Sequence, residues 1–237
     1  MTLHDAFLIQ QRLCELEFPF TFHKGLQFAL FRTYGIPSIS KLLVKTKQLS
    51  EPATACKRYV DTEVLVSEFC QYPPESERAI EAIARTNYIH SFYRDSKQVS
   101  NEDMLYTLSL FALEPMRWVD RYEWRRLENF EKNALGTFWK AIGDAMGIEY
   151  ANFLDHGKEG WKDGLQWFED VSAWAEEYEV TAMKPSIDNH RTAEETTKLL
   201  LWYVPDWAKG LGKLLVVTLM DQRLRTAMLY ATSSCAY

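Results

Sequence analysis

Residues 100–115, Ser-Asn-Glu-Asp-Met-Leu-Tyr-Thr-Leu-Ser-Leu-Phe-Ala-Leu-Glu-Pro, decide the fold class of this 237-residue chain. The stretch opens with an S-x-x-D capping box, in which two side chains satisfy free N–H groups at the start of a helix. Leu105, Leu108 and Phe111 then follow at the spacing of one helix face. Pro115 is expected to kink or end that helix, because proline lacks the N–H group that an interior helical hydrogen bond needs.

The same periodicity extends over most of the chain, which contains only 10 glycines and 8 prolines. It predicts an all-α fold. Helices are expected at residues 5–16, 21–34, 38–43, 52–72 and 75–94, from residue 100 onward, and at 128–146, 161–178, 193–203 and 206–230. We expect a single helical domain over residues 1–230 and an unstructured C-terminal tail over residues 231–237, where the periodicity is lost.

The charge balance and the cysteines narrow the functional class. Lys and Arg number 27 against 33 Asp and Glu, so the formal net charge is −6 and no nucleic-acid partner is expected. The four cysteines form no CxxC motif, which predicts reduced thiols in an intracellular protein. The sequence has neither a signal-peptide pattern nor a run of about 18 apolar residues, so no transmembrane segment is expected in this chain.

His90 is the first candidate for a functional residue. It shares one face of the helix predicted at residues 75–94 with Ile83, Thr86 and Asn87. A haem ligand needs such a face, because small or apolar neighbours let the porphyrin approach while a nearby polar group orients the second ring nitrogen. The alternative is a histidine that is hydrogen-bonded in the core or exposed on the surface. Nearby arginines are candidates for the haem propionates or for ordinary surface salt bridges; they are Arg85, Arg94, Arg121 and Arg125.

Arg58, Asp61 and Thr62 form the second candidate group. Their spacing of three and four residues puts them on one face of the helix predicted at residues 52–72. They would form a polar patch over a cofactor, where the arginine neutralises an anion and the other two handle protons or water. The alternative is a solvated face on which Asp61 pairs with Arg58 or with Lys57.

Other patterns favour packing over chemistry. The chain contains no Glu-x-x-His motif of a di-iron site, no G-x-S-x-G elbow and no Walker or G-x-G-x-x-G loop. Gly136 and Gly143 suggest the close approach of a neighbouring helix or of a flat ligand. Four aromatic residues are interpreted as core, or else as the lining of a pocket for an apolar, isoprenoid-like ligand. They are Trp118, Trp124, Phe138 and Trp139.

Four stretches carry a resemblance to a known family. They are Phe-Arg-Thr-Tyr-Gly-Ile-Pro-Ser-Ile-Ser-Lys-Leu-Leu at 31–43, Lys-Arg-Tyr-Val-Asp-Thr at 57–62, Ala-Arg-Thr-Asn-Tyr-Ile-His-Ser at 84–91 and Glu-Trp-Arg-Arg-Leu at 123–127. These stretches resemble the fungal ER-bound oxygenases of the mycophenolic-acid-pathway type, which are similar to bacterial rubber oxygenase, the latex-clearing protein. The resemblance extends from about residue 18 to about residue 230.

The resemblance implies a globin-like helical core around a non-covalent haem b. It also implies an O₂-dependent cleavage of a carbon–carbon double bond in an isoprenoid chain. His90 falls at the position of the proximal iron ligand, and Arg58 and Thr62 match the distal motif of rubber oxygenase. Asp61 stands where rubber oxygenase has a lysine, so the distal chemistry is not expected to carry over intact.

The sequence therefore predicts a haem b-dependent oxygenase whose substrates are O₂ and a terpenoid or prenylated secondary metabolite. The expected catalytic residues are Arg58, Asp61 and Thr62, and the expected iron ligand is His90. The other expected haem contacts are Arg85, Asn87, Arg121 and Arg125. The alternative is a catalytically inactive helical protein that binds haem or a hydrophobic ligand. The expected location is the cytoplasm or the surface of the ER membrane, and the oligomeric state is left open.

Overall fold

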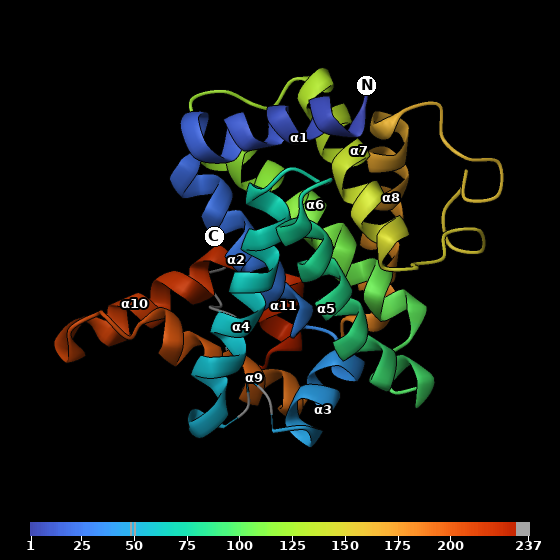
Figure 1. Ribbon diagram of the computed structural model, residues 1–237. Coiled ribbons are helices and arrows are strands. Elements are labelled where there is room, and N and C mark those ends of the chain that lie inside the picture. Colours follow the sequence, from blue (N-terminus) through green and yellow to red (C-terminus); the bar gives the residue numbers. More distant parts are fainter. Residues whose placement is uncertain (48, 50, 231–237) are drawn as a thin grey trace. The chain divides into compact units, whose positions relative to one another are not determined.

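The protein is mainly helical in the part of the chain that the computed structural model describes, which comprises residues 1–47, 49 and 51–230. Eleven α-helices and one π-helical turn, with no strand, make up the regular structure of these residues (Figure 1). The all-α prediction is confirmed. The predicted tail at residues 231–237 lies outside the described residues, and so does Cys235.

Internal contacts group the chain into two compact units, and each unit is described by itself. The first unit comprises Met1–Leu30 and Glu63–Glu177, and the second comprises residues 31–62 and 178 onward. The boundaries between the units fall within α2 (Pro19–Thr33), α4 (Pro52–Gln71) and α8 (Gly164–Ala182). The prediction of one domain over residues 1–230 stays a prediction, as does the globin-like haem core.

The first unit is built around aromatic side chains. Its remaining elements are α1 (Leu3–Arg12), η1 (Leu13–Glu17), α5 (Glu77–Asp95), α6 (Asn101–Tyr122) and α7 (Asn129–Ala145). Helices α1 and α6 both pack against α7. Trp139 and Trp167 are among the largest fully buried side chains of the molecule, together with Phe7 and Phe138. Burial of such rings supplies much of the hydrophobic stabilisation of a helical core.

The second unit has a core that mixes apolar and polar side chains. It contains α3 (Pro37–Lys45), α9 (Ile187–Leu200), α10 (Asp206–Leu219) and α11 (Gln222–Ala227). Helix α3 packs against α9. The amide nitrogen of Asn189, which is fully buried on α9, lies 3.0 Å from the carbonyl oxygen of Gly35 and 3.1 Å from that of Ala227. Asn189 therefore ties α9 to the end of α2 and to α11.

Helix α6 continues through Pro115 to Tyr122, so of the two effects expected of this proline, a kink or the end of the helix, the end does not occur. Pro115 is buried, and Gly25 of α2 lies against it. A Cβ atom at position 25 would lie 2.6 Å from the Cα atom of Pro115. Helices α2 and α6 therefore pack closely against each other at Pro115.

Three other boundaries differ from the expectations. The helix predicted at 21–34 begins two residues earlier, at Pro19, because the first turn of a helix suits a residue with no N–H group to satisfy. The helix predicted at 193–203 begins earlier, at Ile187, because Ser186 caps it through the N–H group of Asp188. The single helix predicted at 206–230 is two helices, because Asp221 caps α11 through the N–H group of Leu224.

Candidate functional site

The three predicted catalytic residues lie on α4, within the second unit. The guanidinium of Arg58 donates to the hydroxyl oxygen of Thr62 at 2.9 Å, and that hydroxyl donates to the main-chain carbonyl oxygen of Arg58 at 2.9 Å. Asp61 instead pairs with Lys57, with 2.8 Å between Nζ and Oδ2. The structure therefore brings Arg58 and Thr62 together and turns Asp61 to an exposed i, i+4 ion pair, one of the alternatives considered for it.

His90 lies half-buried on α5, in the first unit. Ser76 caps this helix, and α5 buries only two residues completely, Ala79 and Ala82. Asn87, three residues before His90, donates to the carbonyl oxygen of Ala145 at the C-terminal end of α7, at 2.8 Å. The helix that carries His90 is therefore fastened to α7 by a polar side chain close to the histidine.

Arg94 makes a second attachment of α5 to the same end of α7. It donates to the carbonyl oxygen of Met146 at 2.9 Å and to that of Gly147 at 3.1 Å. Asn87 and Arg94 are seven residues apart, so they lie on one stripe of α5, and His90 falls within that stripe. The bonds satisfy carbonyl groups that a helix end leaves without partners. Gly147 takes the left-handed conformation, with φ +66°, that commonly follows a helix C-terminus.

The residues around His90 fit an imidazole-ligated haem. The carbonyl oxygen of the Asn87 side chain is buried and accepts no hydrogen bond from the described residues. Asn87 comes one helical turn before His90, so it supplies a buried acceptor of the kind that fixes the orientation of a ligating imidazole. The predicted pairing of His90 with Arg58 and Thr62 joins residues of different units, and it stays a prediction.

Arg85 and Arg121, two of the arginines predicted to bind the haem propionates, each lie next to a tyrosine ring. The guanidinium of Arg85 lies 5.5 Å from the ring centroid of Tyr88, and that of Arg121 lies 5.9 Å from the ring centroid of Tyr122. Both arginines are exposed. Their guanidinium groups are thus held by cation–π contacts on the surface of the first unit.

Arg125 is held in an ion-pair network of the first unit. It donates to Glu17 at 2.7 Å and makes a bidentate contact with Glu131 at 2.7 and 2.8 Å. Burial raises the pKa of Glu131, but the hydrogen bonds from Arg125 and from the N–H group of Glu128 outweigh it, so the pKa stays below its usual value. The contacts of Arg125 therefore fasten η1 to the start of α7.

The two glycines of α7 serve close packing. A Cβ atom at Gly136 would lie 1.9 Å from the carbonyl oxygen of Gly164, the first residue of α8. A Cβ atom at Gly143 would lie 2.1 Å from the hydroxyl oxygen of Tyr150 and 2.5 Å from Leu108. Of the two alternatives, a neighbouring element or a flat ligand, the structure shows neighbouring elements at both positions.

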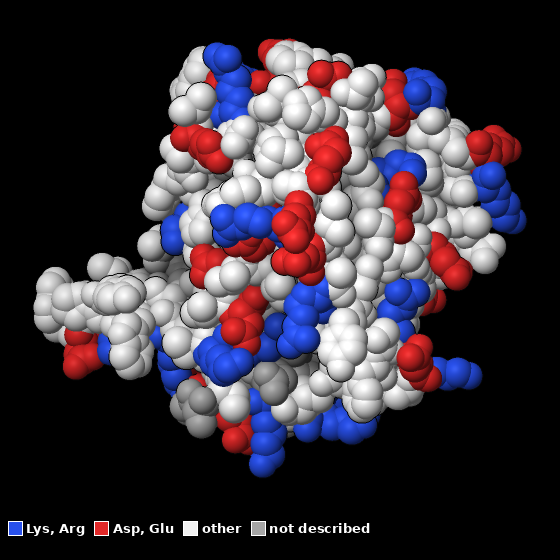
Figure 2. All heavy atoms as spheres, in the orientation of Figure 1, with Lys and Arg blue, Asp and Glu red and all other residues white. Residues whose placement is uncertain are grey.

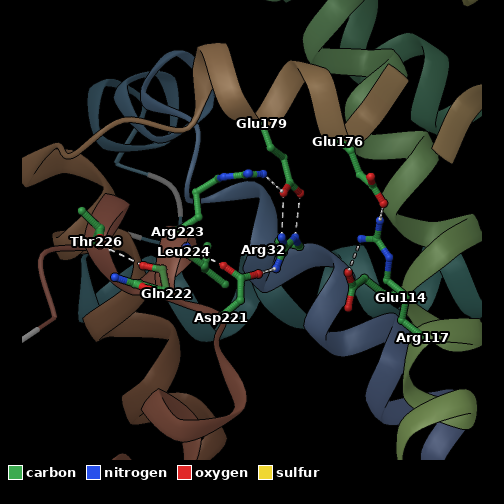
Figure 3. Close-up of polar contacts among 10 residues, drawn as sticks. All are labelled: Arg32, Glu114, Arg117, Glu176, Glu179, Asp221, Gln222, Arg223, Leu224 and Thr226. Atoms are coloured by element: carbon green, nitrogen blue, oxygen red, sulfur yellow. Dashed lines mark hydrogen bonds and ion pairs between the residues drawn. The ribbon is translucent and has the colours of Figure 1, made fainter. Parts of the chain in front are cut away.

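An ionic cluster in the second unit, centred on the buried side chains of Arg32 and Glu179, is not apparent from the sequence. Arg32 makes a bidentate pair with Glu179, at 2.7 and 2.8 Å, and a 2.5 Å contact with Asp221 (Figure 3). Arg223 adds a 3.3 Å contact to Glu179. Burial raises the pKa of the Asp221 carboxyl, but Arg32 and the N–H group of Leu224 outweigh it and hold that pKa below its usual range. The cluster joins the ends of α2 and α8 to the start of α11.

Arg32 lies inside the family stretch at residues 31–43, yet its partners are 147 and 189 residues away. No spacing rule connects residues so distant. The signal that the sequence offers is an arginine directly after the phenylalanines of α2. If that position is buried, the arginine requires an acidic partner.

Asp170 organises the connection between α7 and α8. It accepts hydrogen bonds from the N–H group of His156 at 3.0 Å, from the imidazole Nδ1 at 2.9 Å and from the indole N–H of Trp161 at 2.8 Å. Burial raises the pKa of Asp170, but these three donors together lower it further than burial raises it. The contacts give His156 a structural role within the first unit.

Three findings concern cofactors, thiols and membranes. No group of three or more His, Cys, Asp or Glu side chains with the arrangement of a metal site occurs in the described part of the chain.

Among the same residues, Cys14, Cys56 and Cys70 form no disulfide, and burial raises the pKa of Cys14 to about 12. None of the described helices has both the length and the apolar character that crossing a bilayer requires.

Comparison with known proteins places the chain in a family. No family profile matches it. The protein named ER-bound oxygenase mpaB of Penicillium roqueforti (strain FM164) is 47% identical to it over 230 residues, which cover 97% of this chain and 77% of that protein. The chain belongs to the family of fungal ER-bound oxygenases. The family predicted from the four sequence stretches is confirmed.

Two other members come from Penicillium brevicompactum. The protein named ER-bound oxygenase mpaB' is 47% identical over 234 residues, or 99% of this chain. The protein named ER-bound oxygenase mpaB is 46% identical over 222 residues, or 92% of this chain. The chain spans about half the length of these two relatives, 55% and 56%.

Proposed function

We propose that this chain is a haem b-dependent oxygenase that uses O₂ to cleave a carbon–carbon double bond in a terpenoid or prenylated metabolite. The observation that carries the proposal is its identity of 46–47%, over more than nine-tenths of its length, to relatives named ER-bound oxygenases. The names of these relatives also support a peripheral contact of this chain with the ER membrane.

In this proposal, His90 would supply an imidazole ligand to the haem iron, and Asn87 would orient that imidazole through the buried carbonyl oxygen of its side chain. The haem would supply the oxygen chemistry that amino-acid side chains lack. The chain's own part is to hold the ring, to exclude water from the substrate and to provide polar groups on α4. Arg58 donates to Thr62, so its positive charge and the hydroxyl group stay within one hydrogen-bonded pair.

Asp61 has a supporting role in the proposal. Lys57 balances its charge at 2.8 Å, and the pair is exposed. A carboxylate paired with a neighbouring lysine adds less negative charge to its surroundings than an unpaired carboxylate does. The replacement of the lysine of rubber oxygenase by an aspartate is therefore compatible with an oxygenase.

The proposal is tested by the absorption spectrum of the purified chain after expression with haem supplied. The wild-type chain should show a Soret band, and His90→Gly should lose it or shift it strongly, because the variant has no imidazole at position 90 to ligate the iron. Added imidazole should restore the band in His90→Gly, because it would occupy the space of the removed side chain. The matched control is His23→Gly, since His23 is also a half-exposed helical histidine of the first unit.

A Soret band that is the same in wild type and in His90→Gly would refute the assignment of His90. Oxygen consumption with a panel of prenylated substrates separates the enzyme from the binding protein. A wild-type chain that holds haem but consumes no oxygen with any of them would favour the catalytically inactive alternative.

A further inference from the structure

Helix α10 presents an apolar face to solvent. The 14-residue helix has no fully buried residue. The exposed side chains recur at i, i+4, i+7, i+8 and i+11, which is one face of an α-helix. They are Trp207, 88% exposed, Leu211, 70% exposed, Leu214 and Leu215, each 60% exposed, and the exposed Thr218. Amphipathic helices of globular proteins usually turn such a face inward, so the outward direction requires an explanation.

The opposite side of α10 is fixed to the rest of the second unit. Gly212 packs so closely on Leu201 that a Cβ atom at position 212 would lie 2.7 Å from a methyl group of that leucine. Lys213 pairs with Glu194 of α9 at 2.7 Å. These contacts set the rotation of α10 about its axis, and therefore the apolar face is a defined surface rather than one orientation of a loose helix.

The turn before α10 extends the same kind of surface. Trp202 is 72% exposed and Tyr203 is 96% exposed. Trp202, Tyr203 and Trp207 thus place three large rings on this surface, and each ring carries one polar N–H or O–H group. Rings of this type favour the boundary between lipid headgroups and hydrocarbon, where the ring is shielded from water while its polar group stays hydrated.

We propose that Trp202, Tyr203 and the apolar face of α10 form a membrane-docking surface that lies in the plane of a lipid bilayer. This inference rests on the proposed function, since it names the surface for the membrane contact proposed there. A helix of 14 residues is about 21 Å long, too short to span a hydrocarbon core of about 30 Å, so it lies along the interface.

The charges on α10 define the kind of membrane. Lys209 pairs with Asp206 at 2.6 Å and Lys213 pairs with Glu194, so both lysines are neutralised by acidic partners. Figure 2 shows mainly uncharged side chains over the α10 segment, at the left of the view. A surface without excess charge matches zwitterionic lipid and does not depend on anionic lipid.

The rings at the face favour a bilayer over a second copy of the chain as its occupant, because their polar N–H and O–H groups suit the hydrated edge of an apolar phase. A bilayer requires no matching partner surface, and a small apolar face with interfacial aromatic rings is enough for reversible binding.

The test is flotation of the purified, haem-loaded chain with phosphatidylcholine vesicles, with and without added phosphatidylserine. The wild-type chain should float with both, and high salt should not release it. Leu211→Glu should lower the bound fraction by about tenfold or more, since it places a charge at the centre of the apolar face. Trp207→Ser is a second variant that should also weaken binding. The matched control is Leu16→Glu, at a leucine that is 75% exposed in η1.

The surface assignment is overturned if the wild-type chain stays with the solvent, if Leu211→Glu floats as wild type does, or if flotation requires phosphatidylserine and disappears in salt. It is also overturned if sedimentation shows a dimer that Leu211→Glu dissociates. The haem absorbance of each fraction separates this result from a failure of the proposed function, which would show as an absence of bound haem in the wild-type chain.

Discussion

Asp170 accepts hydrogen bonds from the main-chain N–H group and the imidazole Nδ1 of His156 and from the indole of Trp161, so one carboxylate orders much of the connection between α7 and α8. Hydrogen bonds to a charged acceptor are stronger than those between neutral groups. Asp170→Asn keeps the shape of the side chain but removes the charge and one acceptor oxygen. We expect it to lower the free energy of unfolding by about 1–3 kcal/mol, measured by urea denaturation.

Asp155 provides the control for this substitution. It lies in the same connection, is exposed, and is expected to tolerate Asp155→Asn within about 0.5 kcal/mol. Equal losses at positions 155 and 170 would contradict the role assigned to Asp170.

Single residues show where prediction from sequence stops. His90 and Asn87 were predictable as neighbours, because residues three apart on a helix always share a face. The contact of Arg125 with Glu17 was not predictable, since Glu17 lies 108 residues before it and no local rule joins them. Asp61 had two candidate partners on its own helix, and the choice of Lys57 over Arg58 follows from the bond that Arg58 makes to Thr62.

At the scale of elements, the contact between α7 and α8 depends on Gly136. Alanine is favoured over glycine in a helix by up to about 1 kcal/mol. A Cβ atom at position 136 would lie 1.9 Å from a main-chain oxygen, which cannot move without shifting α8. Because overpacking typically costs about 1–3 kcal/mol, we expect Gly136→Ala to destabilise the protein, as measured by the urea midpoint of helical circular dichroism.

Gly210 is the matched control, since it lies inside α10 and a Cβ atom at this position would have nothing within 4 Å. Gly210→Ala should therefore be neutral or slightly stabilising. A stabilising Gly136→Ala would show that α8 adjusts to the extra methyl group more easily than the close contact implies.

Element boundaries were predictable where a cap or a glycine marks them. Ser100 caps α6 through the N–H group of Asp103, and Gly147 follows α7, as expected. The break between α10 and α11 was missed because the apolar period continues across it. Asp221 is the signal that could have revealed the break, since an aspartate after an apolar run suits a helix N-cap.

At the scale of the whole molecule, acid should destabilise both units. Carboxyl groups with lowered pKa occur in each: Glu131 and Asp170 in the first unit, Glu194 and Asp221 in the second. In every case the hydrogen bonds and charges of the donors outweigh the effect of burial. In the unfolded chain these carboxyls have their ordinary pKa values, 3.8 for Asp and 4.5 for Glu. As the pH falls through these values, the unfolded chain therefore binds more protons than the folded chain.

The urea midpoint should therefore hold steady from pH 7 to about pH 5 and fall as the pH drops below about 4.5, through the pKa values of the folded state. Glu131→Gln should flatten part of this dependence, because glutamine has no proton to gain. A midpoint that is constant down to about pH 3 would contradict the assigned direction of these pKa shifts.

The helical class followed from sequence because periodicity is a local property that survives without knowledge of tertiary contacts. The division into two units did not follow, because it depends on which helices pack together over long separations. The residues predicted for the iron site are divided in the same way, with His90 in one unit and Arg58 in the other. Sequence and family resemblance therefore give the residues of the candidate site, and the proposed spectra test whether they act together.

The bonds from Asn87 and Arg94 to the end of α7 end on main-chain carbonyl oxygens. Every amino acid carries such an oxygen, so positions 145 and 146 are free to vary without loss of the anchor, whereas positions 87 and 94 are not. Evolutionary drift should thus be uneven across this contact, with substitutions accumulating on the α7 side. We therefore expect positions 87 and 94 to vary less among relatives than positions 145 and 146, which an alignment of the family would check.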